Sequence, residues 1–284
     1  MATRTQSKAP TNNTDANFRL WINEFHNAKI AAGWVDTLAT GGINLATVTR
    51  PTAAATKKGF KVYRMGDTLQ STSPLFVRVE FGSDLAYING VGLWITLGTQ
   101  HDGLGNLAGN VVPEFNIYSY TDGVTTLYNC ISSGTSSRFS LSMFDNAPAL
   151  SHNFHFFVER IKNDDGTDSD KGFVFGMYCY QVKLFGCLYK EGTGSYYANN
   201  TAVVACPITG NGVDGADLGI YPMKIFKGIE LNNPTVAVFF IENDITKGTT
   251  FVADMYGVSR TFRALNNTYP ASVRGDIVPA MLWE

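Results

Sequence analysis

The chain has 284 residues, a formal net charge of −2, 44% hydrophobic residues and 16% charged residues. This composition excludes a disordered chain, and the lack of net positive charge excludes the broad basic field that draws proteins to nucleic acid. The charged fraction lies below the roughly 25% of an average soluble domain, which is typical of a β-protein rich in neutral turns or of a surface covered by partners.

Targeting and redox signals are equally sparse. The longest apolar stretch, Thr235 to Ile241, is far shorter than the roughly 20 residues of a membrane span, so we expect no membrane partner. The N-terminus is polar and lacks the apolar core of a signal peptide, which predicts synthesis in the cytoplasm. Without a C-x-x-C pair, the cysteines are expected to be reduced and buried: Cys130, Cys179, Cys187 and Cys206.

Residues 1–13 are polar and predict an extended arm. From Thr14 to Ala32 apolar residues recur with the helical period, with Thr14 as the N-cap and Gly33 as the stop. The apolar face is heavily aromatic, and the following segment up to residue 57 offers it little core. We therefore expect the helix to pack on the β-region or on another subunit, with these candidate partner-docking residues: Phe18, Trp21, Ile22 and Phe25.

From residue 58 onward the hydrophobic period changes from 3.6 to 2. Val79 and Phe81 alternate with Arg78 and Glu80, as in a strand with one wet face, and further short strands follow between Gly, Asn, Asp and Pro. Crossover helices are missing from the pattern. The sequence thus predicts an all-β fold of antiparallel β-sandwich units with an N-terminal arm and one amphipathic helix.

Two regions follow from this pattern. Residues 1–57 form the arm and aromatic helix, and residues 58–284 form the β-sandwich region. In one arrangement the second region divides near residues 125–150 into two packed units. The C-terminal stretch could dock on other chains or fold back on its own domain, and its candidate docking residues are Met281, Leu282 and Trp283.

The glycine tract "GLGNLAG" places Gly103, Gly105 and Gly109 one residue away from the dinucleotide-binding spacing. No helix is predicted behind it to bind a phosphate, so it is interpreted as turn chemistry at positive φ. Strand spacing sends His152 and His155 to opposite faces, which argues against a shared metal. No catalytic, cofactor-binding or metal-binding residue is predicted. Carboxylates that a glycosidase could use are Glu80, Asp84, Glu114, Glu159 and Asp254.

Two charged segments have alternative interpretations. The hairpin tip at residues 163–171 carries Asp164, Asp165, Asp168 and Asp170, whose oxygens suit a hard cation, but it lacks the spacing of a calcium loop. A solvated tip is therefore favoured, and cation binding stays open. The basic segment from Arg50 to Lys61 is interpreted as a connector rather than a nucleic-acid contact.

Several segments in fixed order resemble virion structural proteins of tailed bacteriophages, of the kind encoded among tail genes. They are "FRLWINEFHNAKIAAGWVDT", "YRMGDTLQSTSPLFVRVEFGS", "GLWITLGTQHDGLGNLAG", "SRFSLSMF" and "FHFFVERIKNDDGTDSDKGF". The resemblance implies a non-enzymatic component of a tail, baseplate or neck, located in the virion. It implies assembly as a symmetric homo-oligomer with other virion proteins, without cofactors and without catalytic residues.

Two other functions remain open at this stage. The chain could be a capsid decoration or a receptor-binding protein that recognises a host surface glycan through exposed aromatics, for which the candidates are Trp94, Tyr118, Tyr120, Tyr196 and Tyr197. It could also be a glycan-cleaving tail enzyme, which would need two carboxylates converging in a cleft.

Overall fold

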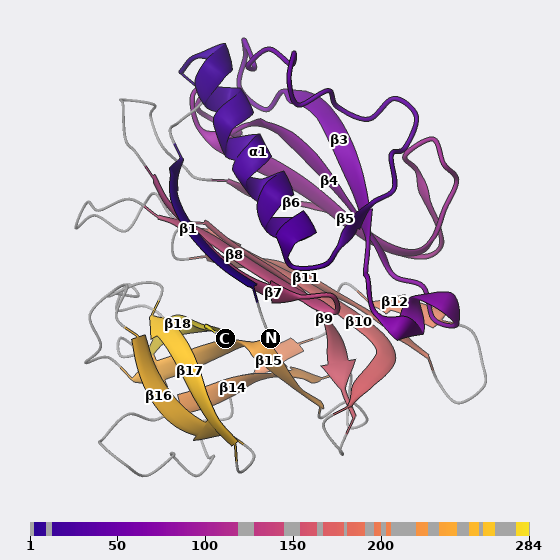
Figure 1. Ribbon diagram of the computed structural model, residues 1–284, viewed down its shortest axis with the longest axis vertical. Coiled ribbons are helices and arrows are strands. Elements are labelled where there is room, and N and C mark those ends of the chain that lie inside the picture. Colours follow the sequence, from indigo (N-terminus) through magenta and orange to yellow (C-terminus); the bar gives the residue numbers. More distant parts are fainter. Residues whose placement is uncertain are drawn as a thin grey trace.

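The computed structural model describes residues 3–9, 13–118, 128–144, 154–163, 167–178, 181–190, 196–199, 203–205, 220–226, 233–242, 250–255, 258–264 and 277–283. These residues form antiparallel β-sheets and one α-helix (Figure 1). The prediction of a mostly antiparallel β-protein with one helix is therefore confirmed.

Three sheets follow one another along the chain, except that the first strand joins the second sheet. The five-stranded sheet contains β2 (Val35–Asp36), β3 (Lys57–Arg64), β4 (Phe76–Ser83), β5 (Val91–His101) and β6 (Leu107–Tyr118). The seven-stranded sheet has the order β1 (Thr3–Ala9), β7 (Tyr128–Thr135), β8 (Arg138–Phe144), β9 (Phe154–Lys162), β10 (Asp168–Tyr178), β11 (Gln181–Lys190) and β12 (Tyr196–Asn199). Between β3 and β4 lies a short 3-10 helix, η1 (Thr68–Ser71).

The six-stranded sheet has the order β13 (Val203–Ala205), β14 (Ile220–Phe226), β15 (Asn233–Glu242), β18 (Ile277–Leu282), β17 (Val258–Ala264) and β16 (Thr250–Met255). The last strand of the chain is thus inserted between β15 and β17, with which it pairs on both sides. Strand β15 also packs against β9 of the seven-stranded sheet.

Helix α1 (Asp15–Ala31) forms where the sequence predicts it. The Thr14 hydroxyl accepts a hydrogen bond from the Asn17 amide at 3.1 Å, which satisfies one of the free donors of the first turn. Gly33 ends the helix with φ +94°, a conformation that favours glycine, and its amide donates to the Ile30 carbonyl. The next residue, Trp34, donates its indole N–H to the Thr135 carbonyl and so ties the end of the helix to the seven-stranded sheet.

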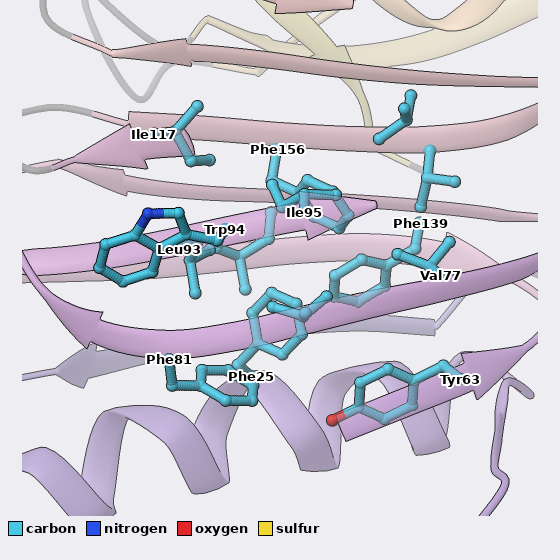
Figure 2. Packing of buried hydrophobic residues seen from close by; sticks show 14 of the residues in the cluster. Phe25, Tyr63, Val77, Phe81, Leu93, Trp94, Ile95, Ile117, Phe139 and Phe156 are labelled. Atoms are coloured by element: carbon cyan, nitrogen blue, oxygen red, sulfur yellow. The ribbon is translucent and has the colours of Figure 1, made fainter. Parts of the chain in front are cut away.

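The core lies where α1, the five-stranded sheet and the seven-stranded sheet meet (Figure 2). Phe25 is central: its ring centroid lies 5.4 Å from that of Phe81 and 6.3 Å from that of Tyr63 on the five-stranded sheet. The same ring lies 5.7 Å from that of Phe139 and 5.9 Å from that of Phe156 on the seven-stranded sheet. One side chain of the helix therefore contacts both sheets.

This packing corrects the proposed docking role of the aromatic helix. Phe18, Trp21, Ile22 and Phe25 are 0–1% exposed, and all belong to the core of their own chain. The sequence shows that one face of the helix must be buried, but not which surface buries it. The helix is internal to the fold, and the boundary placed at residue 57 does not separate it from the sheets that it packs against.

Lys29 and Arg160 are fully buried basic side chains in this part of the molecule. Lys29 is 0% exposed, and its Nζ lies 3.5 Å from the ring centroid of Trp34, with Tyr63, Phe139 and Phe156 around it. Among the described residues its ammonium has no hydrogen-bond partner. Burial holds the pKa of Lys29 well below its usual value, because the aromatic surroundings cannot replace the water that solvates the charge.

Arg160, also 0% exposed, is paired more conventionally. Its Nε and Nη2 donate to the two carboxylate oxygens of Asp67, and Nη2 also donates to the Ser73 carbonyl at 2.9 Å. Asp67 precedes η1, so this forked ion pair fastens the β3–β4 connection to strand β9.

We expect Phe25→Ala to lower the free energy of unfolding by about 3–5 kcal/mol, since it leaves a cavity between both sheets and the helix. Urea unfolding followed by tryptophan fluorescence measures this change. Leu85→Ala, in the β4–β5 connection and 51% exposed, is the control and should change stability by less than about 0.5 kcal/mol. Similar small effects for both variants would contradict the internal position of the helix.

We expect Lys29→Met to raise the free energy of unfolding at neutral pH by about 1–3 kcal/mol, because methionine fills the aromatic box without a desolvated amine. Because the pKa of Lys29 is lowered in the folded state, the unfolded chain binds more protons than the folded chain at pH values between the folded pKa and 10.5. Wild-type stability should therefore rise relative to the variant as the pH increases from about 7 to 10. Urea midpoints of both proteins across this range test the expectation, and a constant difference would contradict it.

Candidate functional site

The outward surface of α1 is poor in charge. The charged residues of this helix are Asp15, Arg19, Glu24 and Lys29. Asp15 accepts a hydrogen bond from the Arg50 amide, Arg19 donates to the Val48 carbonyl, Glu24 is half-buried, and Lys29 is buried. The solvent-facing residues, called here the helix outer face, are Ala16, Leu20, Asn27, Ile30 and Ala31. Surface helices normally carry charged residues on this side, so the helix outer face has the character of a contact surface.

Exposed apolar side chains on this surface reinforce that character. Leu20 is 44% exposed and Ile30 is 40% exposed, and Val35, which begins β2 just beyond the helix, is 36% exposed. These residues are not among the docking residues predicted from the sequence, because the helical period points to the aromatic face. In the sequence, the small number of charged residues on the face opposite the aromatic one is the feature that indicates them.

Strand β1 lies beside the helix (Figure 1). Residues 3–9, expected to belong to an extended arm, pair antiparallel with β7 from Thr3 opposite Gly134 to Ala9 opposite Tyr128. β1 is the edge strand of the seven-stranded sheet. Helix outer face and sheet edge are thus neighbours near the N-terminus of the chain.

A second cluster lies on the face of the five-stranded sheet that points away from α1. Lys57 Nζ lies 2.5 Å from Glu80 Oε2 and 2.6 Å from Glu114 Oε1, and Arg78 Nη2 lies 2.8 Å from Glu80 Oε1. The Lys57 ammonium also lies 5.5 Å from the ring centroid of Trp94. Strands β3, β4 and β6 each supply charged residues, so the cluster links three strands.

The charges of this cluster balance. Burial alone would raise the pKa of Glu80, but the hydrogen bond from Lys57 and the charges of Arg78 and Lys57 outweigh it and lower that pKa. For Lys57, burial alone would lower the pKa, and the hydrogen bonds to Glu114 and Glu80 raise it. Both partners are therefore held in their charged forms.

This cluster is also where two of the carboxylates noted in the sequence come together. Glu80 and Glu114 share the Lys57 ammonium. A general acid for glycoside cleavage needs a raised pKa, whereas the pKa of Glu80 is lowered. The geometry is that of an ion-pair network rather than an acid and base pair. Asp84 and Glu159 are buried elsewhere, at 0% and 1% exposure.

Gly103 and Gly105 lie in the turn between β5 and β6, as the sequence predicts, whereas Gly109 lies within β6 at a register shift. Gly103, Gly105 and Gly109 all have positive φ, between +73° and +99°. The Asp102 carboxylate accepts hydrogen bonds from the amides of Leu104 and Asn106, so it organises the turn internally. A Cβ on Gly105 would lie 2.2 Å from the Phe60 ring, which requires glycine at this close approach.

The histidines that the structure describes do not assemble a site. His26 Nδ1 lies 3.1 Å from the Tyr63 hydroxyl, and burial is the main cause that lowers the pKa of His26. His155 Nδ1 lies 2.9 Å from Ser142 Oγ, but both side chains are 0% exposed, so this pair does not meet a substrate. His152 lies outside the described residues, and its position relative to His155 stays a prediction.

The C-terminal docking candidates are held within their own chain. Met281 and Leu282 are 0% exposed in β18, and the backbone amide of Trp283 donates to the Thr261 carbonyl at 2.8 Å. The Arg263 guanidinium lies 4.8 Å from the Trp283 ring centroid. The alternative that this stretch folds back on its own domain is therefore correct, because β18 occupies an inner position of its sheet.

Of the acidic hairpin tip, Asp164 and Asp165 lie outside the described residues. The backbone N–H of Asn163 donates a hydrogen bond to the Thr167 carbonyl at 2.9 Å and so closes the loop. Within the described ranges, no group of three or more His, Cys, Asp or Glu residues could hold a metal ion. Cys130 is buried, as expected.

Comparisons with known proteins give no family assignment. No protein-family model matches the chain, and no curated protein matches it significantly. Across the part of the chain that the structure describes, no helix is both long enough and apolar enough to cross a membrane.

We expect Glu80→Gln to lower the free energy of unfolding by roughly 1–3 kcal/mol at neutral pH, since a buried acceptor of charged donors is lost. A lowered folded-state pKa stabilises the fold above the unfolded value of 4.5, and this stability disappears as the pH falls through the folded value. The difference between the two proteins should therefore vanish in acid. Denaturant titrations from about pH 7 to 3 measure it.

Glu114→Gln is the matched control, because it removes the other carboxylate on Lys57 from a side chain that is 35% exposed. Its effect should be smaller, since water screens an exposed pair. An equal loss for both variants, or a difference that persists in acid, would contradict the role of Glu80 as the buried centre of the network.

Proposed function

We propose that this protein is a non-enzymatic structural subunit of a tailed-bacteriophage virion, in the tail, baseplate or neck, that assembles as a symmetric oligomer with other virion proteins. The observation that carries the proposal is the helix outer face, which presents Leu20 and Ile30 where a solvated helix would carry charge. The segment resemblance to phage virion proteins supports the same role.

The fold suits a building block. We interpret the five-stranded and seven-stranded sheets, which share one core with α1, as an antiparallel β-sandwich with the helix along its side. The aromatic core fixes the relative positions of both sheets. A rigid body with a charge-poor contact surface loses little conformational entropy when it joins an assembly.

The alternatives receive less support from the described residues. A glycan-binding surface needs exposed aromatics, yet Trp94 is 6% exposed and Tyr118 is 1% exposed. Tyr120 lies outside the described residues, and the side chains of Tyr196 and Tyr197 are not described. A glycan-cleaving enzyme needs a carboxyl with a raised pKa, and Glu80 does not provide it.

We expect the purified chain to form a discrete oligomer in light scattering and Leu20→Glu to reduce it to the monomer mass of 31.0 kDa. A charge placed in an interface core loses its water without a partner, so it should weaken association at least tenfold. Leu85→Glu is the matched control, since Leu85 is 51% exposed in the β4–β5 connection and should leave the oligomer intact.

A monomeric wild-type chain at high concentration would contradict self-assembly. The virion assignment has its own test: mass spectrometry of purified particles from the source of this sequence should find the chain at a fixed ratio to the other structural proteins. Its absence from particles would overturn that assignment, whatever the oligomeric state.

A further inference from the structure

Strand β1 is attached differently from the rest of the fold. Its sequence, TRTQSKA, has no large apolar side chain, and its register with β7 runs through seven residue pairs at the edge of the sheet. The structure describes two attachments for this strand, the backbone ladder with β7 and its position beside α1. A ladder depends on strand direction and register, so the same seven pairs form equally well when a second copy of the chain supplies the strand.

The connection to the body of the molecule is short. Residues 10–14, with the sequence PTNNT, separate Ala9 from Asp15, the first residue of α1. Fully extended, they allow β1 to reach at most about 20 Å from the start of the helix. Pro10 fixes its own φ and favours extended backbone at Ala9, so the sequence at this junction favours a strand that runs on rather than folding back.

The body keeps its anchorage without β1. Helix α1 is held by Phe25 between both sheets, and its end is held by the Trp34 indole on the Thr135 carbonyl. Releasing β1 would therefore open the β7 edge and leave the described aromatic contacts of the helix unchanged. That edge would then accept an equivalent strand.

Burial of the helix outer face would favour the presence of a second copy of the chain at the β7 edge. Because β1 lies beside α1, a copy that supplies the strand is held within reach of Leu20 and Ile30, the exposed apolar residues of that helix. Exchange of the strand would then add the burial of this surface to an unchanged ladder.

We propose that β1 is exchanged between copies in the assembled oligomer, so that Thr3–Ala9 of one chain pairs with β7 of its neighbour. The inference rests on the proposed self-assembly and names the partner of the β7 edge as a second copy of this chain. Reciprocal exchange gives a dimer, and exchange in one direction around an axis gives a ring.

The register supplies a covalent test. Ser7 lies opposite Cys130, a cysteine on β7 that is 3% exposed. Opposed residues of antiparallel strands have Cα atoms about 4.5–5.5 Å apart, which is within the range of a disulfide. Ser7→Cys, with Cys179, Cys187 and Cys206 replaced by serine, is assembled, oxidised and run on a denaturing gel without reductant.

Strand exchange predicts covalent species at twice the 31.0 kDa chain mass or higher multiples, which collapse to one chain on reduction. The same variant with Cys130→Ser should give no such species. Thr5→Cys with Ser132→Cys repeats the test at a second opposed pair. A disulfide found only within single chains would overturn the proposal, and so would failure to link at both positions, since β1 would then not occupy β7.

Light scattering of the reduced variant tests self-assembly separately from the exchange of β1. A monomer mass before oxidation contradicts self-assembly itself. An oligomer whose disulfides all lie within single chains leaves self-assembly standing and overturns only the exchange of β1.

Discussion

The contact of Phe25 with rings from both sheets is the interaction on which the rest of this structure depends. Phe81 belongs to β4 of the five-stranded sheet, whereas Phe139 and Phe156 belong to β8 and β9 of the seven-stranded sheet. Aromatic pairs in edge-on or tilted geometry add directional preference to the hydrophobic effect. The helix therefore sets how the two sheets sit on one another, rather than decorating a finished β-domain.

Packing the helix against both sheets buries basic side chains, and the loss of their hydration costs free energy. Placing the helix against both sheets buries Lys29 among aromatic rings, where its ammonium is poorly solvated. Fastening the β3–β4 connection to the same body buries Arg160, but here the Asp67 carboxylate supplies a forked partner. The two residues show the difference between a buried cation that is only surrounded and one that is matched.

The same arrangement decides which surfaces are free for partners. Once the aromatic face of α1 is used inside the chain, the opposite face is left outward, and it carries Leu20, Asn27 and Ile30. The charges of the five-stranded sheet are concentrated instead in the Lys57, Glu80 and Glu114 network. The charges of this network neutralise one another, and the helix outer face carries no charge. The surface best suited to a partner therefore lies on the helix outer face, beside β1.

The sequence by itself determined the local elements. The helical period, Thr14 and Gly33 fixed α1, and the period of two fixed the antiparallel strands, because these signals act between residues close in the chain. Periodicity shows that a face is buried but not what buries it. Only the tertiary structure decided that Phe25 lies in its own core, that β1 pairs with β7, and that Lys57 meets a glutamate 57 residues away. These contacts join distant segments, so they depend on how whole sheets pack.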